Sequence, residues 1–306
     1  MDLSSLLIDM EEPAEDMRLH QAAYSGHLDT LRQLLQQAKY RQGINKQLRL
    51  LGVSPLRLAV SGDSPECVSC LLDHGAEVDL TDMKAQTPLF VAVKDQHLEC
   101  ARVLLERGAC PNGSAENLST PLAQCCQAGW LPGVQILLSF GADPEVGLLR
   151  GGLLPSLPLH TAAVYHHLDC FLALLLAGSL ADPARRPRVP ADAVRQVSLP
   201  HAVLKYRCSV EFVELLYEFG GNLWQLNSGG LLAWEAEPDS LLVKPIKQLA
   251  GTPHSLQNLC RLLLRRQLGR RQLARLAQLP LPKPVVKYLI YSDTIRLVQF
   301  GTFRFS

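Results

Sequence analysis

Prolines recur along this chain at nearly regular intervals, and a glycine follows each of them twenty residues later. The prolines are Pro55, Pro88, Pro121, Pro158 and Pro200, and the matching glycines are Gly75, Gly108, Gly141, Gly178 and Gly220. Successive prolines lie 33, 33, 37 and 42 residues apart. A period of about 20–50 residues is typical of a solenoid, whose units bury their apolar faces against one another. This repeat limits the possible folds more than any single motif does.

The residues within each unit predict two helices. Ser54–Pro55, Thr87–Pro88 and Thr120–Pro121 each place a hydroxyl N-cap before a proline at the first helical position. The glycine is suited to close the second helix, where the backbone turns left-handed. Leucine pairs lie between these two signals: Leu71–Leu72, Leu104–Leu105, Leu137–Leu138 and Leu174–Leu175.

The corner between the two helices also repeats. His27, His97 and His167 are each followed by a leucine and then an acid, which the dipole favours in the first turn of a helix. The 33-residue period and the Thr-Pro-Leu openings at Thr87 and Thr120 resemble an ankyrin array. About six repeats are expected from Met17 to Gly221, the last one irregular. The predicted fold class is therefore all-α, an ankyrin-repeat solenoid.

A second pattern lies near the C-terminus. Leu256, Leu259, Cys260, Leu263 and Leu264 recur at helical spacing and form one apolar face. A cysteine in such a face behaves as a small apolar side chain. The alternative to a functional helix here is a simple C-terminal cap of the upstream domain.

Leu279, Pro280, Leu281 and Pro282 follow this helix, and the two elements together resemble a SOCS box. The resemblance implies a small helical domain that binds Elongin B/C through Leu256, Leu259, Cys260 and Leu264. It also implies that the Leu-Pro-Leu-Pro element selects cullin five, which brings its RING subunit.

Ankyrin repeats followed by a SOCS box resemble one family, the ankyrin repeat and SOCS box proteins. The expected division is an N-terminal tail at 1–16, repeats at 17–223, a connecting segment at 224–250, the SOCS box at 251–293 and a tail at 294–306. Insertions are expected at Glu145–Leu157 and at Ser179–Val197, and a connecting helix at Ser240–Leu249.

Composition excludes several classes of protein. The net charge of +1 does not favour a general nucleic-acid binder, which usually has a strongly basic domain. No apolar run approaches the length of a membrane span, and no signal peptide is visible. The nine cysteines show no disulfide spacing, which fits a reducing compartment. We therefore expect a cytoplasmic protein, with the nucleus as a further compartment.

Metal and catalytic sites find little support. Cys67 and Cys70 form a Cys-x-x-Cys, but no second cysteine pair follows to complete a zinc site. His167 lies near Cys170, but it occupies the same corner position as His27 and His97, so the repeat explains it without a metal. No phosphate-binding loop or nucleophile elbow is present, so no enzyme activity, cofactor or metal is expected. Six arginines form a basic patch, read as a solvated helix face with a nuclear-localisation or membrane site as the alternative: Arg261, Arg265, Arg266, Arg270, Arg271 and Arg275.

The favoured function is substrate recognition for an Elongin B/C–cullin–RING ubiquitin ligase. The alternative is a non-catalytic ankyrin scaffold or sequestering protein that recruits no ligase. The target-binding surface is predicted on a finger and the adjoining first helices, at Arg57, Asp82, Lys84, Phe90 and Lys94. Packing of Phe90 between repeats is the alternative for that residue.

Overall fold

The computed structural model describes residues 14–48, 52–117, 119–146, 157–181, 198–273, 275–278 and 280–292. These residues form helices, with one isolated antiparallel bridge between Leu48 and Val53. The expected all-α fold is confirmed. Most of the two predicted insertions lies outside the described residues, as do the N-terminal residues 1–13 and the tail from 293 onward.

The described residues contain six helix pairs, one for each predicted repeat. They are α2 (Ala14–Tyr24) with α3 (Leu28–Gln36), α5 (Pro55–Ser61) with α6 (Pro65–Asp73), α7 (Pro88–Lys94) with α8 (Leu98–Glu106), α9 (Pro121–Ala128) with α10 (Leu131–Ser139), α11 (Pro158–Val164) with α12 (Leu168–Leu176), and α14 (Leu199–Lys205) with α15 (Val210–Glu218). A short helix, α4 (Ala38–Gln42), follows the first pair.

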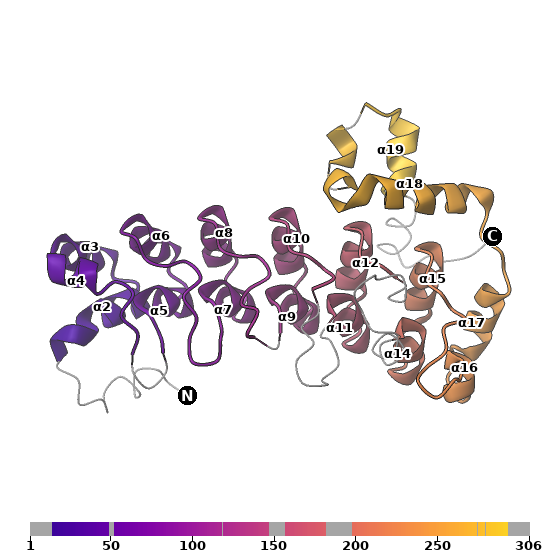
Figure 1. Cartoon of the computed structure of the whole chain (residues 1–306), viewed down its shortest axis with the longest axis horizontal. Coiled ribbons are helices and arrows are strands. Elements are labelled where there is room, and N and C mark those ends of the chain that lie inside the picture. The colour runs from indigo at the N-terminus through magenta and orange to yellow at the C-terminus, as the bar shows by residue number, and fades with distance from the viewer. Residues whose placement is uncertain are drawn as a thin grey trace. The chain divides into compact units, whose positions relative to one another are not determined.

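The chain divides into two compact units, Met1–Asn117 and Leu118–Ser306. In the first unit α2, α5 and α7 form an inner layer, and α3, α6 and α8 form an outer layer (Figure 1). In the second unit α9, α11 and α14 stack beside α10, α12 and α15 in the same way (Figure 1). The first leucine of each predicted pair is fully buried, at Leu71, Leu104, Leu137 and Leu174.

Capping explains why the inner helices begin where they do. The hydroxyl oxygens of Ser54, Thr87 and Thr120 accept hydrogen bonds from backbone N–H groups three residues later, at 3.3, 3.2 and 3.1 Å. Each of these residues precedes a proline at the first helical position, which lacks the N–H that would otherwise be unpaired. The predicted N-caps are confirmed.

The glycines that close the outer helices have the left-handed backbone expected of them. Their φ angles are 91° at Gly75, 88° at Gly108, 85° at Gly141, 91° at Gly178 and 73° at Gly220. A residue with a Cβ pays a steric cost at such angles, which explains why glycine recurs here.

Side chains at the corners bind neighbouring repeats together. A ring nitrogen of His97 lies 2.8 Å from the carbonyl oxygen of Val60, and one of His167 lies 3.2 Å from that of Gln127. In the last repeat Cys208 takes this place, and its thiol donates to the carbonyl oxygen of Ala163 at 3.1 Å. These bonds keep successive corners in register within each unit.

Shorter helices follow the last repeat. They are α16 (Ala233–Ala236), α17 (Val243–Ala250), α18 (Leu256–Leu273), the 3₁₀ turn η2 (Leu276–Gln278) and α19 (Lys283–Leu289). The predicted connecting helix is α17, which begins three residues later than expected. Helix α18 runs across the ends of α12 and α15, and α19 lies beyond it (Figure 1).

Candidate functional site

Helix α18 begins at a side-chain cap and bends near its end. The hydroxyl oxygen of Ser255 accepts a hydrogen bond from the backbone N–H of Asn258 at 3.1 Å. At Gly269 the backbone is non-helical, with φ 67° and ψ 169°, so the helix kinks there.

Five side chains on one face of α18 are exposed to solvent. Leu256 is 77% exposed, Leu263 56%, Leu259 49% and Leu264 47%, and Cys260 is exposed as well. These five residues include all four predicted Elongin contacts, and we call them the leucine face. Burying a leucine side chain contributes roughly 1.5–3 kcal/mol of favourable free energy. Burial of the leucine face against a partner would therefore be strongly favourable.

The opposite side of α18 is polar and packs against the protein. Asn258 is 4% exposed and Arg265 7%, and Arg261 is half-buried between them along the helix. The helix therefore has the reverse of the usual arrangement, in which leucines face the core and charges face water. A reversed helix of this kind is typical of an element that receives a second partner on its apolar side.

Arg265 holds α18 against the rest of its unit. One guanidinium nitrogen donates to the carbonyl oxygen of Leu289 at 2.7 Å. The other donates to the carbonyl oxygens of Leu175 and Leu176 at 3.1 and 2.8 Å. Because these carbonyls belong to the ends of α19 and α12, one side chain joins three helices. Charge-assisted hydrogen bonds of this kind are the stronger ones in proteins.

Aromatic rings lie near the guanidinium groups of both Arg265 and Arg261. The ring of Tyr291 stacks on that of Phe219 with centroids 4.1 Å apart, and Arg261 lies 4.0 Å from the Tyr291 centroid. The Tyr291 hydroxyl donates to the carbonyl oxygen of Glu218 at 3.2 Å. Burial raises the pKa of Tyr291 to about 12, so the phenol remains a neutral donor.

Side chains of α18 pack against two of the glycines that close the outer helices. A Cβ at Gly178 would lie 3.1 Å from a Leu273 methyl carbon, and one at Gly220 would lie 3.0 Å from a Leu262 methyl carbon. A Cβ at Gly75, Gly108 or Gly141 would meet nothing within 4 Å. In the last two repeats, α18 therefore packs closely over the glycine that closes the outer helix.

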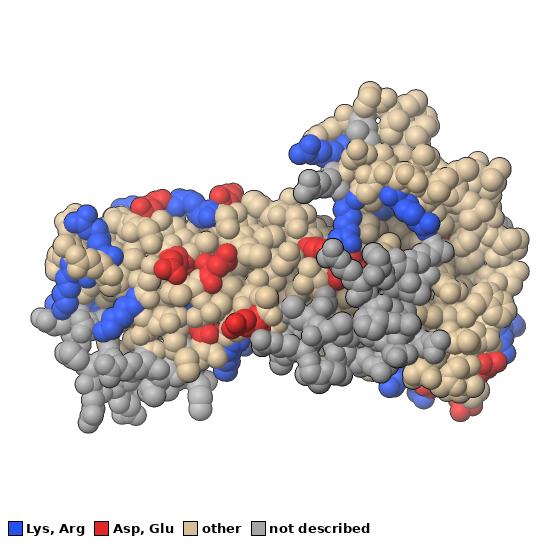
Figure 2. All heavy atoms as spheres, in the orientation of Figure 1, with Lys and Arg blue, Asp and Glu red and all other residues tan. Residues whose placement is uncertain are grey.

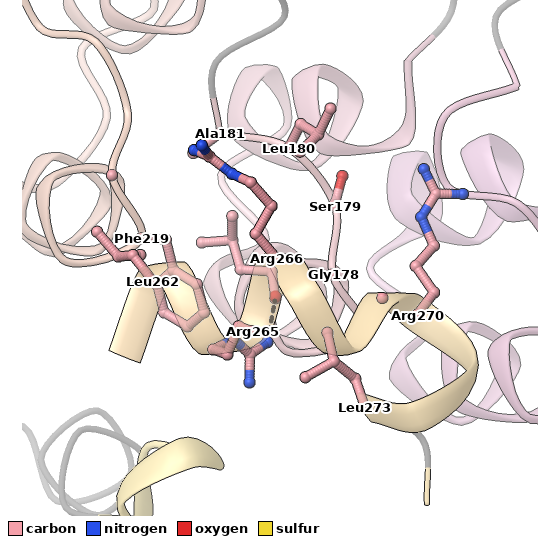
Figure 3. A pocket seen from close by; sticks show the side chains of 13 residues that line it. Gly178, Ser179, Leu180, Ala181, Phe219, Leu262, Arg265, Arg266, Arg270 and Leu273 are labelled. Carbon is pink, nitrogen blue, oxygen red and sulfur yellow. Dashed lines mark hydrogen bonds between the residues drawn. The ribbon is translucent and has the colours of Figure 1, made fainter. Parts of the chain in front are cut away.

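A cavity of about 250 Å³ lies between α18 and the ends of the last two repeats. Figure 2 shows basic side chains and a hollow in the surface beneath α18. Arg265 donates hydrogen bonds to the backbone at the end of α12, while Arg266 and Arg270, which also line the cavity, extend from α18 on either side of Ser179 (Figure 3). Arg270 forms an ion pair with Asp143.

The interpretation of the arginine patch as a solvated face is wrong for Arg261, Arg265 and Arg270. Arg265 is buried, Arg261 stacks on tyrosines and Arg270 is paired, whereas Arg266 and Arg275 are exposed. Sequence reasoning missed this function of the arginines in holding α18. The available signal was the four-residue spacing of Arg261 and Arg265, which places both on one side of a helix.

The Leu-Pro-Leu-Pro element lies just before α19. Pro280 is exposed, Leu281 is 37% exposed, and Pro282 is the N-cap residue of α19. Leu279 lies outside the described residues. The three described members thus present a short, rigid segment to solvent.

The predicted target-binding residues fall into two groups. Phe90 is only 4% exposed, so burial within the array, the alternative to partner contact, is what the structure shows. The Asp82 carboxylate accepts hydrogen bonds from the N–H groups of Lys84 and Gln86, and it lies 3.6 Å from Nε of Arg57. Asp82 and Arg57 therefore shape the finger. Of the five residues, only Lys84 and Lys94 have exposed side chains.

The described residues also bear on metal, membrane and thiol sites. These residues contain no group of three or more His, Cys, Asp or Glu side chains placed to hold a metal ion. None of the helices in the described segments is both long and apolar enough to span a membrane. All nine cysteines are described and carry free thiols, and only Cys110 and Cys260 are exposed.

Two protein families match the chain. Residues 19–115 match the family described as ankyrin repeats (3 copies), and residues 252–290 match the SOCS box. The second match spans α18, η2 and α19, the elements that carry the leucine face and the proline element.

Whole-length relatives combine the same two parts. The chain is 48% identical to human ankyrin repeat and SOCS box protein 1, over 92% of this chain and 90% of the relative. It is 49% identical to human ankyrin repeat and SOCS box protein 12, over 90% of this chain and 91% of the relative. Among solved structures, the human ASB11 ankyrin repeat domain matches with a TM-score of 0.59 and 28% identity, covering 77% of this chain and 99% of that domain.

Proposed function

This chain belongs to the ankyrin repeat and SOCS box protein family, and on that premise we propose that it is the substrate-recognition subunit of an Elongin B/C–cullin–RING ubiquitin ligase. In this function the ankyrin repeats bind a target protein, and the SOCS box binds the ligase core. Ubiquitin transfer is then carried out by other subunits, and we expect no catalysis, cofactor or metal in this chain.

The observation that carries the proposal is the reversed polarity of α18. Asn258, Arg261 and Arg265 face the protein, and the leucine face is exposed to solvent. An exposed helix face made of four leucines and a cysteine fits a hydrophobic groove on a partner. We propose that Leu256, Leu259, Cys260 and Leu264 enter such a groove on Elongin C.

The proline element supports the proposed contact with a cullin. The rings of Pro280 and Pro282 restrict the backbone φ angle on both sides of Leu281, which lowers the entropy lost on docking. We propose that this element, together with Leu279, contacts cullin five and so brings its RING subunit.

The mechanism is proximity. A target held by the repeats is placed near the charged ubiquitin-conjugating enzyme, which raises the effective concentration of its lysines there. Because α18 is bonded to the end of α12, the repeats of this unit and the SOCS box are joined directly and not through a loose linker. We expect this assembly in the cytoplasm, and in the nucleus as a further compartment.

The test is titration of the purified chain with purified Elongin B/C. Leu256→Ser with Leu259→Ser should weaken binding by about thirtyfold or more, because truncating a central anchor typically costs about 2 kcal/mol or more. Thermal unfolding of the free chain should be unchanged, since both side chains are exposed.

A matched control lies on the same helix. Gln257→Ser with Gln267→Ser alters two exposed polar positions and should leave binding intact. Equal affinity of the leucine variant and the parent would place the Elongin contact elsewhere. If the parent chain does not bind Elongin B/C at all, the scaffold or sequestering function takes precedence.

A further inference from the structure

The corners of the last two repeats carry exposed aromatic and basic side chains. Tyr165 is 47% exposed and Tyr206 is 43% exposed, and each is the C-cap residue of its inner helix, α11 or α14. His166, Lys205 and Arg207 are exposed beside them. We call these five residues the corner patch.

The two corners adjoin one another. The bond from the Cys208 thiol to the carbonyl oxygen of Ala163 joins them, and α11 packs against α14. Tyr165 lies two residues after Ala163, and Tyr206 lies two residues before Cys208. The two tyrosines are thus at equivalent positions of neighbouring helices, which pack roughly 8–10 Å apart.

The backbone at this corner would suit glycine better than the residues present. His166 has φ 62° and Arg207 has φ 52°, whereas the corresponding residue of the preceding repeat is Gly129, with φ 66°. A left-handed conformation costs an ordinary residue roughly 1–2 kcal/mol. Asp63 and Gln96, at the corresponding corners of two earlier repeats, also have positive φ angles, of 49° and 62°, so this strain belongs to the repeat corner in general.

Most side chains of the corner patch make no polar interaction within the described part of the chain. Within the described part of the chain, the side chains of Tyr165, His166 and Arg207 make no hydrogen bond or ion pair. The Lys205 ammonium lies 5.7 Å from the centroid of its neighbour Tyr206, so it too remains on the surface.

The charges at this corner are mainly positive. Asp169, in the first turn of α12, is exposed nearby in the chain, where it also complements the helix dipole. Glu211, in the first turn of α15, has a buried carboxylate oxygen. Lys205 and Arg207 are therefore left facing solvent beside two tyrosines. Tyrosine and arginine are the residue types that dominate binding energy at protein interfaces.

We propose that the corner patch is a docking surface for an extended, acidic segment of a partner protein. If the chain is a substrate receptor as proposed above, that partner is its target. A nucleic acid fits the patch less well, because phosphate recognition relies on many basic contacts, and this patch has two permanent positive charges in a chain of net charge +1.

The probe is a fluorescein-labelled peptide of repeating Glu-Pro-Leu units, followed by fluorescence anisotropy with the full chain. A peptide with lysine in place of glutamate and a labelled oligothymidine serve as comparison ligands. Only the glutamate peptide is expected to show saturable binding, and added salt should weaken it.

The decisive variant is Lys205→Glu with Arg207→Gly. Glycine relieves the left-handed strain at position 207 and Lys205 is exposed, so the melting temperature of this variant should match that of the parent. The affinity for the glutamate peptide should fall by about tenfold or more, and Tyr165→Ala with Tyr206→Ala should have a similar effect.

The matched control is Lys244→Glu with Lys247→Glu, which reverses two exposed charges of α17 and should leave the affinity unchanged. The proposal is overturned if the parent does not bind the glutamate peptide, if the patch and control variants bind it equally, or if oligothymidine binds more tightly. None of these measurements uses Elongin B/C, so failure of ligase recruitment is detected separately.

Discussion

The guanidinium of Arg265 lies 5.2 Å from the centroid of the Tyr291 ring, and both residues are buried. Tyr291 follows α19 in the chain, and Arg265 lies in the middle of α18. Together they place the C-terminal helices on the end of the repeats, with the leucine face directed outward.

Arg265→Ala should destabilise this arrangement. The change leaves the carbonyl oxygens of Leu289, Leu175 and Leu176 without their charged donor, and each lost bond of this type costs about 1.5–3 kcal/mol. We expect faster hydrogen exchange in α19 and at the end of α12, measured by mass spectrometry. Arg266→Ala, at the exposed neighbouring position, is the control, and equal exchange in both variants would contradict the function assigned to Arg265.

Alanine at Pro280, Leu281 and Pro282 should separate cullin binding from Elongin binding. These residues are outside the leucine face and Leu281 is partly exposed, so Elongin B/C should be retained while cullin five is lost. Co-elution of purified components measures both. Gln278→Ala, at an exposed position just upstream, should bind both. Loss of both partners would instead show that the proline element stabilises the SOCS box.

Elongin B/C should protect one thiol from modification. Cys260 and Cys110 are exposed, whereas the other seven cysteines are buried. Burial raises the pKa of those seven thiols, which suppresses the reactive thiolate: Cys67, Cys70, Cys100, Cys125, Cys126, Cys170 and Cys208. A maleimide should label Cys260 and Cys110 in the free chain. With Elongin B/C bound, only Cys110 should react, and continued labelling of Cys260 would argue against its burial by Elongin C.

The stability of the fold should decrease as the pH rises from 4.5 through about 7, because of Glu214. Burial, reinforced by the nearby Glu211, raises the pKa of the Glu214 carboxyl from 4.5 to about 7. The folded state therefore holds this proton more tightly than the unfolded state does. The resulting stability is fully present below pH 4.5 and is lost as the pH rises through about 7.

Glu214→Gln should remove this dependence. Its melting temperature should exceed that of the parent at pH 8, and the difference should vanish near pH 4.5. Glu106→Gln, on an exposed position of α8, should change neither value. Identical pH profiles for the parent and Glu214→Gln would show that Glu214 does not carry the effect.

Local chemistry allowed most of the fold to be predicted. A threonine or serine before proline starts an inner helix, and a glycine twenty residues later closes the outer one, because both effects act within one helical turn. The spacing of Leu256, Leu259 and Cys260 likewise placed them on one face, since that depends only on helix geometry. The region that matches the SOCS box, residues 252–290, was therefore located from the sequence.

Tertiary contacts decided which way these faces point. The sequence alone favoured a solvated arginine face and a partner-binding Phe90, whereas the structure buries Arg265 and Phe90. Arg265 is buried because it reaches carbonyl oxygens of Leu175 and Leu176, about ninety residues earlier in the chain. Periodicity fixes which side chains share a face, because that follows from backbone geometry over a few residues. The direction of a face depends on distant residues that meet only after folding, and a buried guanidinium is stable only where such residues supply its hydrogen bonds.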